Sequence, residues 1–496
     1  MRFDLTANRF VDEHLRAEAW AVVGSDRALR WHELAAQARE WVERARAHGF
    51  AQDVPLMVRG HKEASFFVAM VGALLLGAPF VPVDTIYPDE RMERIARALG
   101  AQIYFDAQSD RFLTVSGKHA ITDPAMFVPR SLRERNLAYV LFTSGTTGEP
   151  KGVQIGRESV ADLAKWMTED FTLGDTPVFL NQAPFSFDLS MYEVFGTLAT
   201  GGTVVLASRA LAAHGGGLLG KLAQYGVTTW VSTPSFAQQQ LLDLRFSQTE
   251  LPLLNTFLFC GEVLSVELVR QLRQRFPAAR IINTYGPTEA TVATTWIVVD
   301  DTVLGKYERL PVGYAKRGAK VFVDAGEICI AGAHVMRGYL NRDDLNAARM
   351  FMCDGQRAFR TGDLGAVDGD RLLFCHGRID DQIKFGGYRI ELSEIDAALC
   401  ALQGVSSAAA VALRRPDGRV MRIVAFVATG SAEGTLPGAL LDWRAQLAVR
   451  LPSYMVPSEL LTYESLPVSA NFKTDRARLV QDYRNHHFKS SFQANA

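Results

Sequence analysis

The sequence from Leu141 to Val153, LFTSGTTGEPKGV, joins an apolar strand to a loop rich in glycine and hydroxyl residues. Tyr139–Phe142 has the apolar character of a buried strand. The ten residues Thr143–Gly152 then supply four hydroxyl residues, three glycines and one lysine. Glycines let backbone N–H groups approach phosphate oxygens, hydroxyls add donors, and a lysine adds a mobile positive charge. The stretch therefore predicts a phosphate-binding loop at the end of a strand.

This loop differs from the G-x-x-x-x-G-K-[ST] loop of many nucleotide-binding proteins. Pro150 stands where that pattern requires glycine, and Gly152 follows Lys151 where it requires serine or threonine. A plain flexible loop is the structural alternative, but the density of glycine and hydroxyl residues favours phosphate binding.

The composition is that of a globular protein with several domains. The 496 residues correspond to two or three domains, and the 48% apolar and 22% charged residues exclude disorder over most of the chain. The net charge of −1 lacks the basic excess of a general nucleic-acid binder. Five cysteines, none with C-x-x-C spacing, argue against a structural zinc site and suit a reducing cytoplasm.

One uncharged segment, residues 66–83 (FFVAMVGALLLGAPFVPV), approaches the length of a membrane span. Gly77-Ala78-Pro79 interrupts it, so we predict a buried helix to about Leu76, a turn, and a buried strand at Phe80–Val83. The start of the chain has no apolar core of a signal peptide. We therefore expect no membrane insertion.

Short β-rich stretches alternate with helical patterns over most of the chain, which predicts βαβ units and parallel sheet. Thr256–Phe259 is one such strand, and Val266–Phe276 is one such helix. From about residue 382 the pattern is that of a small α+β unit. It contains a helix at Ser393–Leu402, which we expect Ser393 to cap, and a strand at Val420–Ala428.

The loop TSGTTGEPKG resembles the phosphate-loop signature of the adenylate-forming enzymes, which include acyl-CoA synthetases, luciferases and the adenylation domains of peptide synthetases. Further segments resemble the remaining motifs of this family in order along nearly the whole chain. They are Val81–Arg91, NTYGPTE at 283–289, RTGD at 360–363, GRIDDQIKFGGYRIE at 377–391, LPSYMVP at 451–457 and LPVSANFKTDR at 466–476.

A finer resemblance is to the D-alanine–carrier protein ligases within this family. It rests on NQAPFSFDLS (181–190), STPSF (232–236), FLFCGEVL (257–264) and INTYGPTEATVA (282–293). Cys260 in particular is typical of that branch, where the cysteine lines the amino-acid pocket. Most other adenylation domains have a small residue there.

The resemblance implies that ATP and Mg²⁺ bind to this chain. Thr143, Ser144, Thr146 and Thr147 would surround the pyrophosphate, and Lys151 would be a further nucleotide contact. Tyr285 would stack on adenine, Thr288 would contact the α-phosphate, Glu289 would help hold Mg²⁺, and Asp363 would accept hydrogen bonds from the ribose hydroxyls. The other implied nucleotide contacts are Asn283, Thr284, Gly286, Pro287, Cys375, His376, Gly377 and Arg378.

The same resemblance implies that Asp188 binds the α-ammonium of an amino-acid substrate. A buried cation requires a paired anion, and fatty-acid and aryl-acid ligases have no such amine to bind. A helix N-cap is the structural alternative for this aspartate. Cys260 and Val292 would bound the side-chain pocket. Tyr192 departs from the branch, in which a smaller apolar residue such as methionine is common, so it would tighten the pocket or add a hydroxyl.

Lys473 matches the family's catalytic lysine. It would bridge the attacking carboxylate and the α-phosphate, two anions that repel each other until a cation neutralises them. The family usually has Asn-Gly-Lys here, whereas this chain has Asn471-Phe472-Lys473. Glycine would give this turn conformational freedom, so Phe472 is expected to alter the loop.

The implied fold is a large multi-subdomain N-terminal adenylation core at residues 1–378 and a small mobile α+β C-terminal domain at residues 379–496. Asp380 matches the hinge at which the small domain changes pose between the two half-reactions. No carrier-like segment follows Lys473, so we expect a separate phosphopantetheinylated carrier protein to accept the product.

The predicted function is activation of a small amino acid, with D-alanine favoured, and its transfer to the carrier thiol. Three alternatives remain open. An enzyme for L-alanine, glycine or serine in natural-product biosynthesis is favoured by the arginine-rich composition and disfavoured by Cys260. An acyl-CoA synthetase is disfavoured by Asp188. A non-catalytic scaffold that binds a carrier is disfavoured by Lys473, Asp363 and the phosphate loop.

Overall fold

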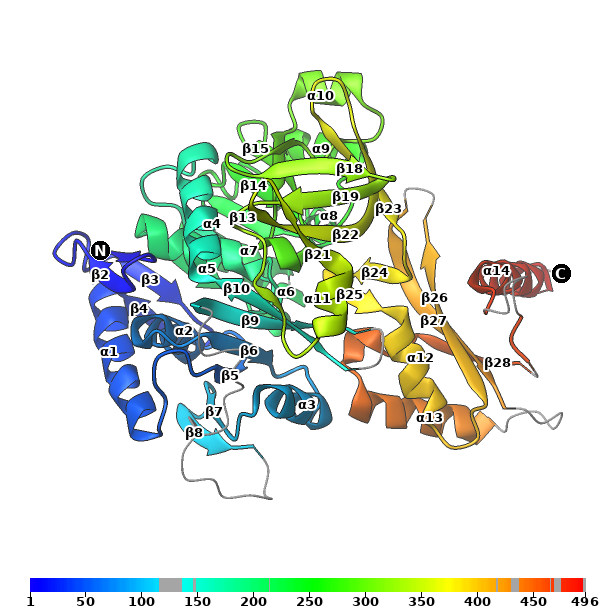
Figure 1. The fold of residues 1–496 in the computed structure, drawn as a ribbon. Coiled ribbons are helices and arrows are strands. Elements are labelled where there is room, and N and C mark those ends of the chain that lie inside the picture. Colours follow the sequence, from blue (N-terminus) through cyan, green and yellow to red (C-terminus); the bar gives the residue numbers. More distant parts are fainter. Residues whose placement is uncertain are drawn as a thin grey trace. The chain divides into compact units, whose positions relative to one another are not determined.

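The computed structural model describes residues 1–115, 136–145, 149–213, 215–415, 418–429, 437–463, 465–467 and 474–493. Figure 1 shows their helices and strands. The described residues fall into two compact units. Those within Met1–Thr85, Ile95–Phe142 and Lys151–Ile379 form unit 1, and those within Ile86–Arg94, Thr143–Pro150 and Asp380–Ala496 form unit 2. Strands and helices occur throughout, so the predicted α/β class is confirmed.

The first sheet of unit 1 has the strand order β20-β10-β9-β6-β5-β7-β8. The strands are β5 (Leu56–Gly60), β6 (Phe80–Asp84), β7 (Ile103–Asp106), β8 (Arg111–Thr114), β9 (Leu137–Thr143), β10 (Lys151–Gly156) and β20 (Gly338–Tyr339). β5, β6, β7 and β9 are joined by parallel pairings, as the βαβ pattern predicts.

The uncharged segment at 66–83 forms part of this sheet and its covering helix. α2 (Ala64–Leu76) is buried along nearly its whole length, and Gly77 ends it with a φ of 79°, a conformation that glycine adopts without strain. β6 follows with every residue buried. The predicted helix, turn and strand are therefore confirmed. Over the described residues, no helix is both long and apolar enough to cross a membrane.

The second sheet of unit 1 has the order β17-β16-β15-β14-β13-β11-β12-β3-β4. Its strands are β3 (Trp20–Val23), β4 (Ala28–Arg30), β11 (Val178–Asn181), β12 (Thr203–Leu206), β13 (Thr229–Ser232), β14 (Thr256–Phe259), β15 (Arg280–Tyr285), β16 (Thr295–Val298) and β17 (Tyr314–Ala315). The run from β15 through β3 is parallel. β14 has the predicted bounds, and α9 (Val266–Arg275) ends one residue before the predicted end.

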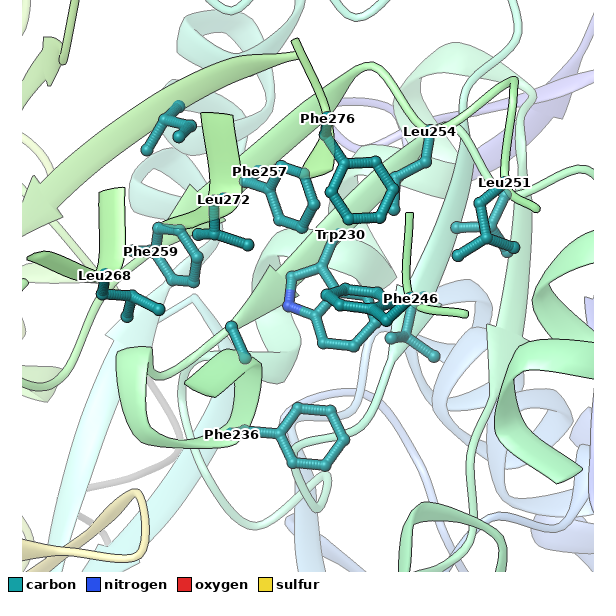
Figure 2. Packing of buried hydrophobic residues seen from close by; sticks show 14 of the residues in the cluster. Trp230, Phe236, Phe246, Leu251, Leu254, Phe257, Phe259, Leu268, Leu272 and Phe276 are labelled. Carbon is teal, nitrogen blue, oxygen red and sulfur yellow. The ribbon is translucent and has the colours of Figure 1, made fainter. Parts of the chain in front are cut away.

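Trp230 of β13 lies at the centre of the hydrophobic core on one face of this sheet. Figure 2 shows aromatic side chains gathered around its indole. Its ring centroid is 5.4 Å from that of Phe236, 4.9 Å from that of Phe246 and 6.1 Å from that of Phe257. These contacts make the sheet a rigid support for the loops at its strand ends.

The third sheet of unit 1 brings two predicted nucleotide residues into register. Its strands are β18 (Lys320–Asp324), β19 (Glu327–Ala331), β21 (Met350–Cys353), β22 (Gln356–Val367) and β23 (Leu373–Arg378). β22 and β23 pair antiparallel with Asp363 opposite Arg378. The other helices of unit 1 include α1 (Trp31–Ala47), α4 (Arg157–Asp170), α5 (Ser190–Thr200), α7 (Gly215–Gln224), α8 (Pro234–Gln240), α10 (Asp301–Lys306) and α11 (Asp343–Arg349).

Unit 2 contains the hairpin β24 (Gln382–Phe385) and β25 (Tyr388–Glu391), and a sheet of order β26-β27-β28. The bounds of that sheet are Ser407–Arg414, Val420–Ala428 and Glu459–Tyr463, and the helices are α12 (Leu392–Cys400), α13 (Pro437–Arg450) and α14 (Arg476–Gln493). The predicted strand Val420–Ala428 is confirmed. The predicted cap by Ser393 is wrong: α12 follows β25 without a loop, so Glu391 takes the N-cap position and Ser393 lies inside the helix.

Candidate active site

Asp363 is held between a phenol and a guanidinium. Tyr285, the last residue of β15, donates its hydroxyl to Asp363 Oδ2 at 2.6 Å. Arg378 Nη1 donates to Asp363 Oδ1 at 3.0 Å and to the carbonyl of Thr361 at 2.9 Å. Burial and the nearby Asp363 raise the pKa of Tyr285 well above its usual value, so its hydroxyl remains a donor. Three residues predicted to contact the nucleotide thus lie together.

The other predicted residues of β23 lie beside this group in sequence. Arg309 donates to the carbonyl of Cys375 at 2.6 Å, His376 is exposed, and Gly377 has a φ of 130° that favours glycine.

The turn after β15 folds back tightly on itself. A Cβ on Gly286 would lie 2.4 Å from the Cα of Ala293, so only glycine fits there. Asn283 donates from Nδ2 to the carbonyl of Pro311 at 2.9 Å. The turn then continues through Pro287 into a short 3₁₀ helix, η2 (Thr288–Ala290).

Gly286→Ala is expected to destabilise this turn, because the added methyl group cannot avoid backbone atoms of Ala293. We expect the free energy of unfolding to fall by about 1–3 kcal/mol, as in other overpacked sites. Urea denaturation would measure the change. Gly305→Ala is the matched control, since a Cβ at Gly305 meets no atom within 4 Å. Equal stability of the two variants would contradict the prediction.

Glu289 is a fully buried carboxylate within η2. Its Oε1 accepts a hydrogen bond from the Tyr339 hydroxyl at 2.6 Å, and its main-chain carbonyl accepts one from Met336 N at 2.8 Å. These contacts fix the position of the carboxylate. In the part of the chain that the structure describes, no group of three or more His, Cys, Asp or Glu residues is arranged to hold a metal ion.

The residues predicted to bound the substrate side chain form one buried cluster. The Tyr192 hydroxyl donates to Thr284 Oγ1 at 3.2 Å, and Thr284 donates to the carbonyl of Phe259 at 2.8 Å. The thiol of Cys260 points to the carbonyl of Val292 at 3.8 Å. Tyr192 of α5 is fully buried, and its hydroxyl is bonded to Thr284 near the end of β15. These contacts fix the position of its ring.

Backbone strain occurs at this cluster. Thr291 has a φ of 52° and Val292 a φ of 72°, although β-branched residues strongly disfavour this region. Thr291 Oγ1 donates to the carbonyl of His334 at 2.6 Å, which helps hold the conformation. Such strain persists where the surroundings determine the backbone, and it is concentrated at functional sites.

Asp188 lies one residue before the N-cap of α5. The N-cap position belongs to Leu189, which makes no side-chain capping hydrogen bond. Asp188 is 8% exposed, and its charge contributes to raised pKa values of Tyr139 and Tyr192, for which burial is the main cause. The Tyr139 hydroxyl is buried and has no hydrogen-bond partner among the described residues. Asp188 therefore lies, nearly buried, close to Tyr139 and to the cluster around Tyr192.

The first residues of the phosphate loop belong to unit 2. Ser144 Oγ donates to the carbonyl of Arg389 at 2.9 Å and accepts from Glu391 N at 3.1 Å. Gly145 N donates to Glu394 Oε2 at 3.3 Å, and Arg91 donates to Glu394 Oε1 at 2.6 Å. In this structure the first residues of the loop are therefore bonded to β25 and α12 of the same unit.

The remaining predicted residues are placed only in part. The buried Thr143 hydroxyl has no partner among the described residues, and Lys151 is buried at the start of β10. Asp380 accepts a hydrogen bond from Gln382 N at 3.3 Å. Thr146, Thr147, Phe472 and Lys473 lie outside the described residues.

The structure also reveals a buried polar group that the sequence motifs did not identify. Lys62 of the β5–α2 connection, Asn181 of β11 and Glu193 of α5 meet inside unit 1. The available signal was a charge in an apolar context: Lys62 precedes the apolar α2, and Glu193 interrupts the apolar start of α5.

Comparisons with known proteins agree with these motifs. The family described as AMP-binding enzyme matches residues 11–340, and the AMP-binding enzyme C-terminal domain matches residues 394–473. A D-alanine–D-alanyl carrier protein ligase of Bacillus mycoides (strain KBAB4) is 37% identical over 510 aligned residues, covering 94% of this chain and 98% of the relative.

Two solved structures share the fold. The Vibrio cholerae adenylation domain AlmE, in complex with glycyl-adenosine-5′-phosphate, has a TM-score of 0.80 at 21% identity and is covered over 97% of both chains. A four-domain nonribosomal peptide synthetase bound to AMP and glycine has a TM-score of 0.65 at 26% identity. That match covers 96% of this chain and 36% of the synthetase.

Proposed function

Since the chain belongs to the AMP-binding enzyme family, we propose that it activates D-alanine with ATP and transfers it to a carrier protein. In the first step a carboxylate oxygen of the amino acid attacks the α-phosphorus of ATP. The aminoacyl-adenylate forms and pyrophosphate leaves. In the second step the thiol of a phosphopantetheine arm attacks the acyl carbon, and AMP leaves as the thioester forms.

The buried cluster around Tyr192, with Asp188 nearby, carries this proposal. A nearly buried carboxylate is stabilised by a cation, and the α-ammonium of an amino acid supplies one. Tyr192, Cys260 and Val292 are buried and fixed by contacts with neighbouring residues, which favours a small side chain. The near full-length relationship to D-alanine–carrier protein ligases favours D-alanine over other small amino acids.

Residues of the nucleotide group fit ATP. The two carboxylate oxygens of Asp363 can accept hydrogen bonds from the ribose hydroxyls. Tyr285 and Arg378 each donate to one of these oxygens and so orient the carboxylate. The buried Thr143 hydroxyl has no hydrogen-bond partner among the described residues, so we assign it to the phosphate oxygens. We assign the remaining nucleotide contacts to Ser144, Thr146, Thr147, Lys151, Asn283, Thr284, Gly286, Pro287, Thr288, Cys375, His376 and Gly377.

Glu289 fits a role in holding Mg²⁺. This ion keeps several waters and takes one or two carboxylates together with substrate phosphates, so a single oriented glutamate suffices. Bound there, Mg²⁺ would neutralise charge on the phosphates. Lys473 is assigned to the transition state of the first step, and Asp380 to the hinge of a small domain that we place at residues 379–496.

The setting of the reaction follows from its chemistry. ATP and a thiol-bearing carrier are cytoplasmic reactants, and the sparse cysteines suit a reducing compartment. We therefore propose a cytoplasmic location and a carrier protein as the macromolecular partner.

Amino-acid-dependent exchange of pyrophosphate into ATP tests the proposal. D-alanine, L-alanine, glycine, D-serine and L-serine would be compared with purified protein under identical conditions. A clear preference for D-alanine, followed by loading of a phosphopantetheinylated carrier, is the expected result. Preference for another amino acid would move the enzyme to natural-product biosynthesis. Activity with fatty or aryl acids would indicate an acyl-CoA synthetase, and no exchange with any acid would indicate a non-catalytic scaffold.

Tyr192→Met is expected to enlarge the pocket that we assign to the substrate side chain. The relative kcat/KM for D-2-aminobutyrate over D-alanine should rise about tenfold, because one methylene in a hydrophobic pocket is worth about 1–3 kcal/mol. Pyrophosphate exchange with both amino acids gives the ratio. Tyr192→Phe keeps the ring and serves as the control. An unchanged ratio in Tyr192→Met would remove this residue from the specificity pocket.

A further inference from the structure

A buried lysine contacts the segment that carries Asp188. Lys62 lies between β5 and α2 and is completely buried. Its ammonium donates to Asn181 Oδ1 and to the carbonyl of Ala183, and lies 4.7 Å from the centroid of the Phe185 ring. Three contacts therefore join one side chain to alternate residues of the segment 181–188, which leads from β11 toward α5.

Glu193 holds the same segment from the other side. Asn181 Nδ2 donates to Glu193 Oε1 at 3.1 Å, so the amide of Asn181 is fixed between the Lys62 side-chain nitrogen and the Glu193 carboxyl group. The second oxygen of Glu193 is buried and has no hydrogen-bond partner among the described residues. Phe185 is further fixed by Phe66 of α2, at a centroid distance of 4.8 Å. The start and middle of the segment are thus restrained by two helices.

Burying the ionisable groups of Lys62 and Glu193 lowers the stability of the fold, whereas apolar side chains at these positions would not have this cost. Burial lowers the pKa of Lys62 to about 7 and raises the pKa of Glu193 to about 8. A well-packed apolar replacement of such a pair is often neutral or stabilising, so stability alone does not explain a buried lysine here. The lysine instead fixes the geometry of its neighbours, because it donates hydrogen bonds to the side-chain amide of Asn181 and to the backbone carbonyl of Ala183. A methionine would leave both acceptors without this donor.

We propose that Lys62 is a positioning residue for amino-acid binding, which acts by fixing the segment 181–188 and thereby the carboxylate of Asp188. The inference rests on the proposed function, in which Asp188 binds the α-ammonium. Lys62 itself does not contact the substrate in this proposal. Its removal should weaken amino-acid binding and leave nucleotide binding intact, since the hydrogen bonds that join Asp363 to Tyr285 and Arg378 do not involve this segment.

Lys62→Met tests the proposal, because methionine has a similar length and no donor. We expect the KM for the preferred amino acid to rise about tenfold or more, because the hydrogen bonds that Lys62 donates to Asn181 and Ala183 are lost, while the KM for ATP stays within about twofold. Pyrophosphate exchange measures both constants. Lys62→Gln retains an N–H donor and should give an intermediate KM for the amino acid. It also provides the test if Lys62→Met does not fold.

Lys316→Met is the matched control. Lys316 is 2% exposed and contacts Asp162 at 2.7 Å and the Trp166 ring at 5.0 Å rather than the segment 181–188. Its replacement should lower stability without a selective rise in the amino-acid KM. Equal KM ratios in Lys62→Met and Lys316→Met would overturn the proposal, as would failure of both Lys62 variants to fold. Wild-type protein without amino-acid-dependent exchange would overturn the proposed function first, so the two failures are distinguishable.

Discussion

Asp188→Asn is expected to lower kcat/KM for the amino acid by a factor on the order of 100 to 1,000, which corresponds to breaking a buried charge pair. The substitution preserves the shape of the side chain and removes its charge. The α-ammonium would then be buried against a neutral amide. The KM for ATP should change less than about twofold, because Asp363 and its partners form a separate group.

The amine dependence of the reaction gives a sharper readout than the rate alone. Propionate has the carboxylate and methyl group of alanine but no amine. Wild-type enzyme should discriminate strongly against it, whereas Asp188→Asn should lose most of that discrimination. A purely structural role for Asp188 would lower activity with both acids and leave their ratio unchanged. Asp301→Asn is the control, since the Asp301 side chain is 87% exposed.

The elements around this site follow local rules and were predictable. β14 has the predicted bounds, and the uncharged run at 66–83 with its Gly-Ala-Pro interruption predicts the helix, turn and strand that the structure has at Ala64–Leu76 and Phe80–Asp84. These features depend on neighbouring residues alone. The cap of α12 was not predictable in the same way. Whether a serine lies at the N-cap depends on where β25 ends, which hydrophobic periodicity does not determine.

In the candidate site, too, local motifs identify individual residues, whereas their contacts come from the tertiary structure. Motifs identified Asp363, Tyr285 and Arg378, and the structure brings these three together. It also joins Tyr192 to the residues around Cys260 and Val292. The roles of these residues stay predictions, since contacts alone do not assign chemistry.

Contacts between distant segments could not be predicted from the sequence. Lys62 and Asn181 are 119 positions apart, and no local pattern connects them. The strained φ of Val292 is likewise set by tertiary contacts. A charged residue next to or inside an apolar helix pattern indicates that the position has a buried polar contact. The pattern does not identify the partner, because the partner comes from another part of the fold.

Lys473→Ala is expected to reduce pyrophosphate exchange by a factor on the order of 100 to 1,000, the effect of removing one group that stabilises charge in a transition state. The carboxylate and the α-phosphate are both anions, and their approach requires a cation between them. A lysine that bridges them contributes most as the new bond forms. The loss should therefore appear in kcat more than in the KM for either substrate.

The second half-reaction separates this role from a general loss of structure. Lys473→Ala supplied with preformed D-alanyl-adenylate should load the carrier thiol at nearly the wild-type rate, because phosphorus chemistry is complete at that stage. Lys320→Ala is a charge-matched control: Lys320 is an exposed lysine paired with Asp354, and such pairs contribute little. If Lys473→Ala loses both half-reactions equally, the lysine supports the fold or the pose of the small domain rather than the adenylation transition state. If it loses neither, another cation performs the neutralisation, and Lys151, buried at the start of β10, is the residue to replace next.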